Sequence, residues 1–112
     1  MKRIAHAAEE PAVHTPDGAQ RRVLSHGGAL MAVQFTFGAG ATSAWHSHPH
    51  EQIGYVVSGE IDLVMDGQPT QRLKAGSSYY VPGNVKHNVV TYAPSVLLDC
   101  FTPQREDFLS KG

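Results

Sequence analysis

Cysteine is nearly absent from this 112-residue sequence, which contains only Cys100. A single cysteine excludes an intramolecular disulfide framework and is compatible with a reducing compartment. An excess of either charge is also missing. Nine basic and ten acidic residues give a formal net charge of -1, which leaves no basic footprint for nucleic acid and no polybasic stretch for a membrane surface.

Long apolar runs are missing as well. No run approaches the length of a membrane span, and no apolar segment follows the basic residues of the opening MKRIAHAAEEP, so we expect no signal peptide. Together with the charge balance, this predicts a cytoplasmic protein without a nucleic-acid or membrane partner.

Helix-forming patterns are also scarce. Only residues 103–110, with an early proline followed by acidic residues, predict a short helical turn. The chain therefore has no room for a helix-turn-helix. In contrast, eleven glycines and seven prolines are scattered between short β-branched and aromatic runs, which is typical of an all-β domain.

The turn formers divide the sequence into short candidate strands. Residues 1–18 are weakly periodic and predict an arm or an edge strand, and Asp66-Gly67 is the clearest hairpin signal. The main predicted strands cover residues 21–25, 29–37, 53–57, 61–65, 71–74, 78–81, 85–92 and 95–102. At this length we expect one domain, residues 1–112, folded as a sandwich or barrel of the jelly-roll kind.

Histidine is abundant, with seven residues, and three of them lie between positions 46 and 50. If this stretch is a strand, His46 and His48 share a face and Gln52 returns to it. Two imidazoles and an oxygen donor on one face form part of a metal site. His87, which follows a proline-glycine turn, is the best candidate for a fourth ligand. His50 follows Pro49, and we expect it beside the ligands or at the pocket rim.

The wider spacing resembles the two motifs of the cupin family. The first motif runs Gly40, five residues, His46-Ser47-His48, three residues, Gln52, six residues, Gly59, and the second runs Gly76, five residues, Pro82, with His87 five positions later. This resemblance implies a single-domain jelly-roll β-barrel, also called a double-stranded β-helix. It also implies one divalent transition metal ion (zinc, nickel, manganese or iron) held by His46, His48, Gln52 and His87.

The sequence departs from the usual family pattern at Gln52, where glutamate is common, and also at Asn84 and Thr91. An amide in place of a carboxylate leaves the metal site one charge more positive and strengthens it as a Lewis acid. Glu51 has the opposite strand parity and does not replace Gln52 as the ligand. A non-redox role is therefore at least as well supported as oxygen chemistry.

Two phrases, HSHPHEQIGYV at 46–56 and DCFTPQREDF at 99–108, resemble the small pectin-degradation cupins of the KdgF type. That group converts 4,5-unsaturated uronate monosaccharides into their linear keto form. The resemblance implies catalytic roles for Asp99 in proton exchange, for Arg105 in binding the substrate carboxylate and for Phe101 in packing on the sugar. It also implies a homodimer.

Other interpretations of the same residues stay open. Asp99 could be a structural acceptor, Arg105 could pair with a neighbouring acidic residue, and Phe101 could belong to the core. Cys100 is predicted to face away from the cavity, and Tyr55, Tyr79 and Tyr80 suit the core or a dimer surface. The chain could also be another metal-dependent cupin enzyme (a dioxygenase, lyase or isomerase) or a binding module for a small acid or sugar without turnover.

Overall fold

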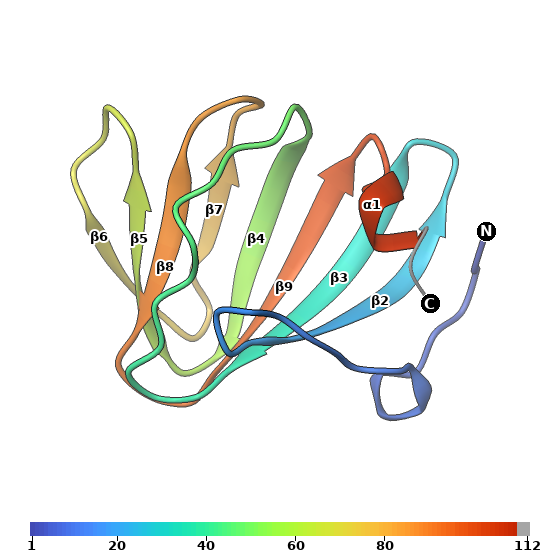
Figure 1. The fold of residues 1–112 in the computed structure, drawn as a ribbon, viewed down its shortest axis with the longest axis horizontal. Coiled ribbons are helices and arrows are strands. Elements are labelled where there is room, and N and C mark those ends of the chain that lie inside the picture. Colours follow the sequence, from blue (N-terminus) through green and yellow to red (C-terminus); the bar gives the residue numbers. More distant parts are fainter. Residues whose placement is uncertain (110–112) are drawn as a thin grey trace.

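Antiparallel strands dominate the computed structural model, which describes residues 1–109 (Figure 1). In this range the elements are η1 (Ala7–Glu9), β1 (Val13–His14), β2 (Gln20–Gly27), β3 (Leu30–Phe37), β4 (Glu51–Ser58), β5 (Glu60–Met65), β6 (Gln71–Lys74), β7 (Ser78–Val81), β8 (His87–Thr91), β9 (Ser95–Thr102) and α1 (Glu106–Leu109). The all-β class predicted from the scattered turn formers is confirmed.

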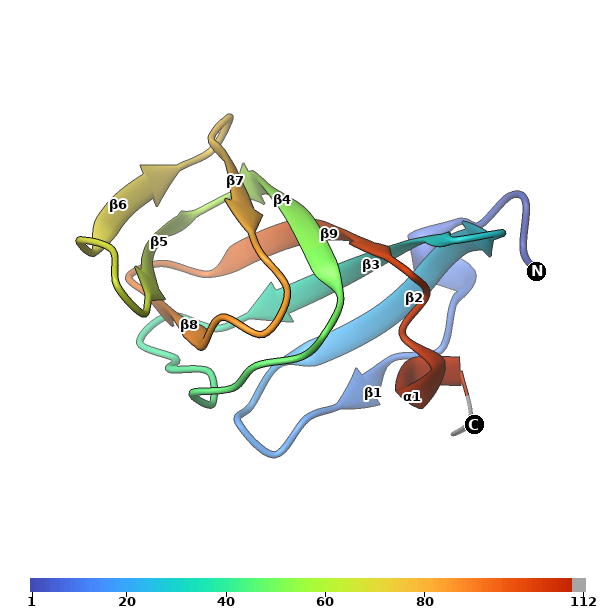
Figure 2. The same ribbon diagram turned by 90° about the horizontal axis from the view of Figure 1, so that it is seen from above.

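The strands form two sheets that make the two walls of a barrel. The larger sheet has the order β1-β2-β3-β9-β4-β7, and the smaller has the order β6-β5-β8. Seen from above, the larger sheet curves towards the smaller one (Figure 2). A long loop, residues 38–50, runs beside β8 and pairs with it through bridges at Thr42 and His46. The walls enclose an interior, which is the jelly-roll arrangement expected from the sequence.

Side chains alternate between the interior and the outside along β4, β7, β8 and β9, as the two-residue period of a strand requires. Apolar residues with almost no exposure fill much of the interior; they include Val33, Val56, Ile61, Val81, Leu97 and Phe101. The same inner surface also contains the polar residues His48, Gln52, His87 and Asp99, all buried. Burying a polar group is costly unless it is paired, so this polar set marks a functional site.

The structure corrects one local prediction. The stretch His46 to His48 is not a strand: β4 begins only at Glu51, and the histidines lie in the preceding loop. Pro49, directly after this stretch, has no N–H to donate to a ladder, so regular pairing is not continuous there. A single bridge between His46 and His87 is what remains of the pairing.

The two ends of the chain also differ in detail from the predictions. Within residues 1–18, the segment contains the short helical turn η1 and the two-residue strand β1, which pairs with the edge of β2. At the other end α1 covers Glu106–Leu109, so the helical turn predicted for 103–110 begins later, and residue 110 lies outside the described residues. No helix among residues 1–109 is long and apolar enough to span a membrane.

Candidate metal and substrate site

Backbone pairing brings the three central histidines together. The His46 N–H donates to the His87 carbonyl (3.2 Å), and the His87 N–H donates back to the His46 carbonyl (2.9 Å). The Asn84 N–H donates to the His48 carbonyl (2.7 Å). The loop is thus fixed to β8 and to the turn before it, and ring nitrogens of His46, His48 and His87 all lie within 4.8 Å of one another.

Each of these rings is oriented by its Nδ1 atom, which lies within hydrogen-bond distance of a backbone carbonyl. The partners of His46, His48 and His87 are the carbonyls of Ala44 (2.6 Å), His50 (3.1 Å) and Val85 (2.8 Å). We assign the proton to Nδ1, because a carbonyl can only accept, which leaves each Nε2 lone pair free. This is the arrangement by which proteins prepare histidines for a metal ion.

The charge state of the buried rings suits the same purpose. Burial, followed by the positive charge of Arg105, lowers the pKa of His48 to about 4. Burial also lowers the pKa of His87. Both imidazoles are therefore neutral near pH 7, which is the form that binds a metal.

Gln52 adds an oxygen donor to the three imidazoles. Its side chain is buried and hydrogen-bonds the Asp99 carboxylate, which requires the amide NH₂ to point towards Asp99. The amide oxygen, Oε1, and His48 Nε2 are both buried without a hydrogen-bond partner among the described residues. Orphaned buried acceptors of this kind call for a bound cation, and three nitrogens with one amide oxygen suit a first-row divalent ion.

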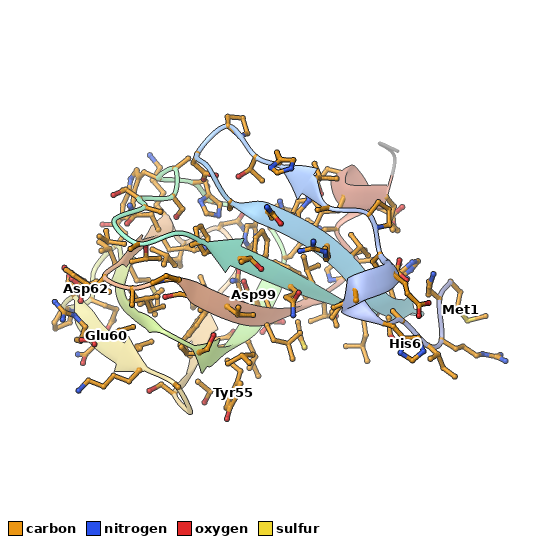
Figure 3. The ribbon with its side chains drawn as sticks, turned by 90° about the horizontal axis from the view of Figure 1, so that it is seen from below. Met1, His6, Tyr55, Glu60, Asp62 and Asp99 are labelled. Atoms are coloured by element: carbon orange, nitrogen blue, oxygen red, sulfur yellow. The ribbon has the colours of Figure 1, made fainter. Side chains whose placement is uncertain are left out.

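Asp99 lies at the middle of β9 (Figure 3), where its carboxylate accepts a hydrogen bond of 2.7 Å from the Tyr79 hydroxyl. Burial raises the pKa of Asp99 to about 6, against the hydrogen bonds from Tyr79 and Gln52, which lower it. Burial also raises the pKa of Tyr79 well above its ordinary value, so its hydroxyl stays a donor. The prediction that Tyr79 suits the core is confirmed, since Tyr79 is part of the buried core cluster, and its side chain also lines the cavity.

Gly54 leaves space for the hydrogen-bonded side chains of Tyr79 and Asp99. It lies on β4 directly between Tyr79 on β7 and Asp99 on β9. A Cβ atom built on Gly54 would overlap both the Tyr79 ring and the Asp99 carboxylate. The absence of a side chain at this one position allows the hydrogen bond to form across the sheet.

We expect Gly54→Ala to lower the free energy of unfolding by about 1–3 kcal/mol, because the added methyl group overpacks the interior. The shift should appear in urea unfolding curves. The matched control is Gly38→Ala, which adds the same methyl where nothing lies within 4 Å. Equal stability of the two variants would contradict the role given to Gly54.

The cavity has a volume of about 200 Å³, and the predicted site residues line it. It is lined by His46, His48, Gln52, His87, Asp99, Phe101 and Arg105, and also by Arg21, Tyr79 and Phe108, which the sequence did not assign to the site. His50 contacts this set from the side, with its ring centroid 5.6 Å from that of His48. Cys100 lies on the outer face of the sheet, as its strand parity predicted.

Arg105 both faces the cavity and pairs with an acidic neighbour, so its position fits the two roles considered from the sequence. It lines the cavity, and its Nε and Nη2 atoms also donate to the two carboxylate oxygens of Asp107 (3.1 and 3.0 Å). Its guanidinium lies over two aromatic rings, 5.1 Å from the centroid of Phe101 and 4.1 Å from that of Phe108. Phe101 is 2% exposed and is at once a core residue and a wall of the cavity.

Comparison with known proteins identifies the family of this chain. Residues 33–101 match the Cupin domain family. The chain is 37% identical to the pectin degradation protein KdgF of Dickeya dadantii, over 97% of this chain and 100% of that protein.

Two solved structures share the whole fold. KdgF from Halomonas sp. superposes with a TM-score of 0.86 at 34% identity, covering 94% of this chain and 98% of that one. An RmlC-like cupin from Shewanella frigidimarina superposes with a TM-score of 0.89 at 35% identity, covering 96% of each chain. The chain therefore belongs to the cupin family, and within it to the single-domain cupins that include KdgF.

Proposed function

We propose that the protein opens the ring of 4,5-unsaturated uronate monosaccharides, from pectin or alginate breakdown, to give the linear 5-keto-4-deoxyuronate. The observation that carries the proposal is one cavity that combines a buried carboxyl group with a metal-type donor set. The near full-length similarity to a pectin degradation protein supports the choice of substrate.

The reaction is an isomerisation and transfers no electrons to an acceptor. The substrate is a cyclic hemiacetal in which the C4=C5 bond forms an enol ether with the ring oxygen. The anomeric hydroxyl loses its proton, the bond between C1 and the ring oxygen breaks, and C4 gains a proton. The products of these changes are an aldehyde at C1 and a ketone at C5, so one proton is removed and one is returned.

Different residues around the cavity transfer the proton and bind the substrate. Asp99 removes and returns the proton, since it is the carboxyl group held at the inner surface by Tyr79 and Gln52. Arg105 binds the substrate carboxylate, and Phe101 packs against the sugar ring and excludes water.

The metal ligands are the second part of the proposal. His46, His48, Gln52 and His87 would hold one divalent ion, and this donor set suits zinc, nickel, manganese or iron. Such an ion supplies a Lewis acid that polarises the oxygens of the substrate.

The test is to incubate the metal-loaded protein with the unsaturated monomer of galacturonate or mannuronate. We expect the alkene absorbance to disappear faster than the spontaneous rate, and Gln52→Ala to remove the acceleration. No acceleration with either sugar rejects the proposal. Oxygen uptake during turnover would instead indicate a dioxygenase.

We also propose a homodimer that buries the outer face of the larger sheet. Ile53, Tyr55, Val57 and Tyr80 are between 45% and 58% exposed there, and Ile53 pairs directly with Tyr80 across β4 and β7. Tyr55 points away from the barrel (Figure 3). A contiguous exposed apolar patch of this kind is characteristic of a protein interface.

A charge on this patch is expected to give a monomer. Ile53→Glu should halve the particle mass measured by light scattering, because a buried unpaired carboxylate opposes association. Gln68→Glu adds the same charge on an exposed turn between β5 and β6 and should leave the mass unchanged. A monomeric parent protein would reject the dimer.

The location and the remaining partners belong to the same proposal. We place the protein in the cytoplasm, with a sugar acid as its small-molecule partner and with no nucleic-acid or membrane partner. The free, exposed thiol of Cys100 and the net charge of -1 support this placement.

A further inference from the structure

We propose that Arg21 is a second carboxylate-binding residue of the cavity, acting with Arg105 to select a sugar acid over the corresponding neutral sugar. The inference deepens the proposed function and rests on it for the identity of the substrate. Two observations support it: Arg21 lies beside the cavity, and its guanidinium donors are unused among the described residues.

Arg21 comes from the strand next to the edge of the larger sheet, far in sequence from the other site residues. It lies on β2, paired with Val13 on β1 and with Phe35 on β3, and it lines the same cavity as Asp99. The helical turn α1 lies beside β1 and β2 (Figure 2). The fold thus brings the start of the barrel and the end of the chain together at one side of the cavity.

The Phe108 ring of α1 contacts the guanidinium groups of both Arg21 and Arg105. The Cζ atom of Arg21 lies 4.0 Å from the centroid of the Phe108 ring, and that of Arg105 lies 4.1 Å from the same centroid. Both distances are well within the range of a cation–π contact. A single aromatic ring therefore holds two positive charges beside the cavity.

The two guanidinium groups differ in the donors that they can offer. Arg105 uses Nε and Nη2 on the Asp107 carboxylate. Within residues 1–109, the Arg21 guanidinium has no hydrogen-bond partner, and the charges that act on it are those of Asp107 and Arg105. Since an arginine carries five N–H donors in a planar fork, Arg21 can receive a carboxylate with two parallel hydrogen bonds.

The acidic groups near the two guanidinium groups are already engaged. Asp107 pairs with Arg105, and Asp99, whose charge also acts on Arg105, accepts a hydrogen bond from the Tyr79 hydroxyl. Asp17 also lines the cavity, but its carboxylate is committed to the Thr15 hydroxyl and to the Ala44 N–H (3.0 Å). A substrate carboxylate would therefore find the donors of Arg21 free of partners from residues 1–109, whereas a neutral sugar has no negative charge to offer them.

The test compares two ligands that differ only in the acid group, galacturonate and galactose, by calorimetric titration of the metal-loaded protein. We expect Arg21→Gln to raise the Kd of galacturonate by roughly 10- to 100-fold and to leave the affinity for galactose unchanged. In turnover, KM should rise while kcat changes little, because the lost contact is made equally in the ground state and the transition state.

Arg22→Gln is the matched control. Arg22 is the next residue on β2, so it faces the other side of the sheet, and its side chain contacts Gln20. This variant should bind galacturonate like the parent. Arg21→Lys keeps the charge and loses the planar fork, so its Kd for galacturonate should lie between those of the parent and of Arg21→Gln. This variant replaces Arg21→Gln in the test if the glutamine variant does not fold.

Three results would overturn the inference: no galacturonate binding by the parent protein, parent-like binding by Arg21→Gln, or an equal loss for galacturonate and galactose. The last would mean that Arg21 only supports Phe108. If galacturonate binding depends on Arg21 but no unsaturated uronate is opened, the carboxylate site stands and the proposed reaction fails.

Discussion

Replacing Asp99 by asparagine is expected to lower kcat for ring opening by about 10²–10⁴-fold, the range for a lost general acid–base group. The two side chains have the same shape, and the amide oxygen of asparagine can still accept the hydrogen bond from Tyr79. The packing of the cavity wall should therefore be kept, but the asparagine NH₂ cannot accept a hydrogen bond from Gln52, so the effect on this metal ligand is checked through the metal content. What the variant loses is a group that can take up a proton and return it.

The measurement combines the rate of alkene loss with the metal content of the purified variant. Asp66→Asn is the matched control, because Asp66 is an exposed turn residue beside Gly67 and Asn-Gly suits the same turn. The control should retain the parent rate. An Asp99→Asn variant that keeps its metal and more than about a tenth of the parent kcat would show that Asp99 is only a structural acceptor.

Replacing His87 by alanine is expected to weaken metal binding by more than about 100-fold, since even the loss of an outer hydrogen-bond partner of a metal ligand costs 10–100-fold. His87 is 3% exposed and is bonded through its backbone to His46, so the remaining ligands should stay in place. Uronate opening should then fall to the spontaneous rate.

Metal content after dialysis against a chelator, measured together with the rate, checks this expectation. His14→Ala is the control, because His14 is an exposed residue of β1 and lies outside the cavity. It should retain both metal and activity. A His87→Ala variant that binds metal as tightly as the parent would reject the proposed ligand set.

The strands of this protein were predictable because their signals are local. Alternating side chains and turn residues such as Asp66-Gly67 act over a few positions, so β6, β7 and β9 begin and end at the predicted residues. The same local reasoning failed for His46 and His48. They lie in a loop whose geometry comes from hydrogen bonds to β8 and to the turn before it, and no pattern within the loop encodes those contacts.

The site residues divide in a similar way. The spacing of the histidines and Gln52 resembles a family motif, so the sequence was sufficient to select them. Tyr79 was missed because its role depends on facing Asp99 across Gly54, which requires the order of β7, β4 and β9 in the sheet. The sequence assigned Tyr79 only to the core or a dimer surface, and strand parity does not identify the residue opposite.

The sequence by itself therefore determined the all-β class, the turns and a set of candidate metal ligands, because these depend on short-range periodicity and spacing. Only the tertiary structure decided which side chains meet. It freed the oxygen of Gln52 by turning its amide towards Asp99, and it brought Arg21 to Phe108 and Arg105 from the opposite end of the chain. The physical reason is that these contacts arise from sheet order and register, which join residues that are distant in sequence.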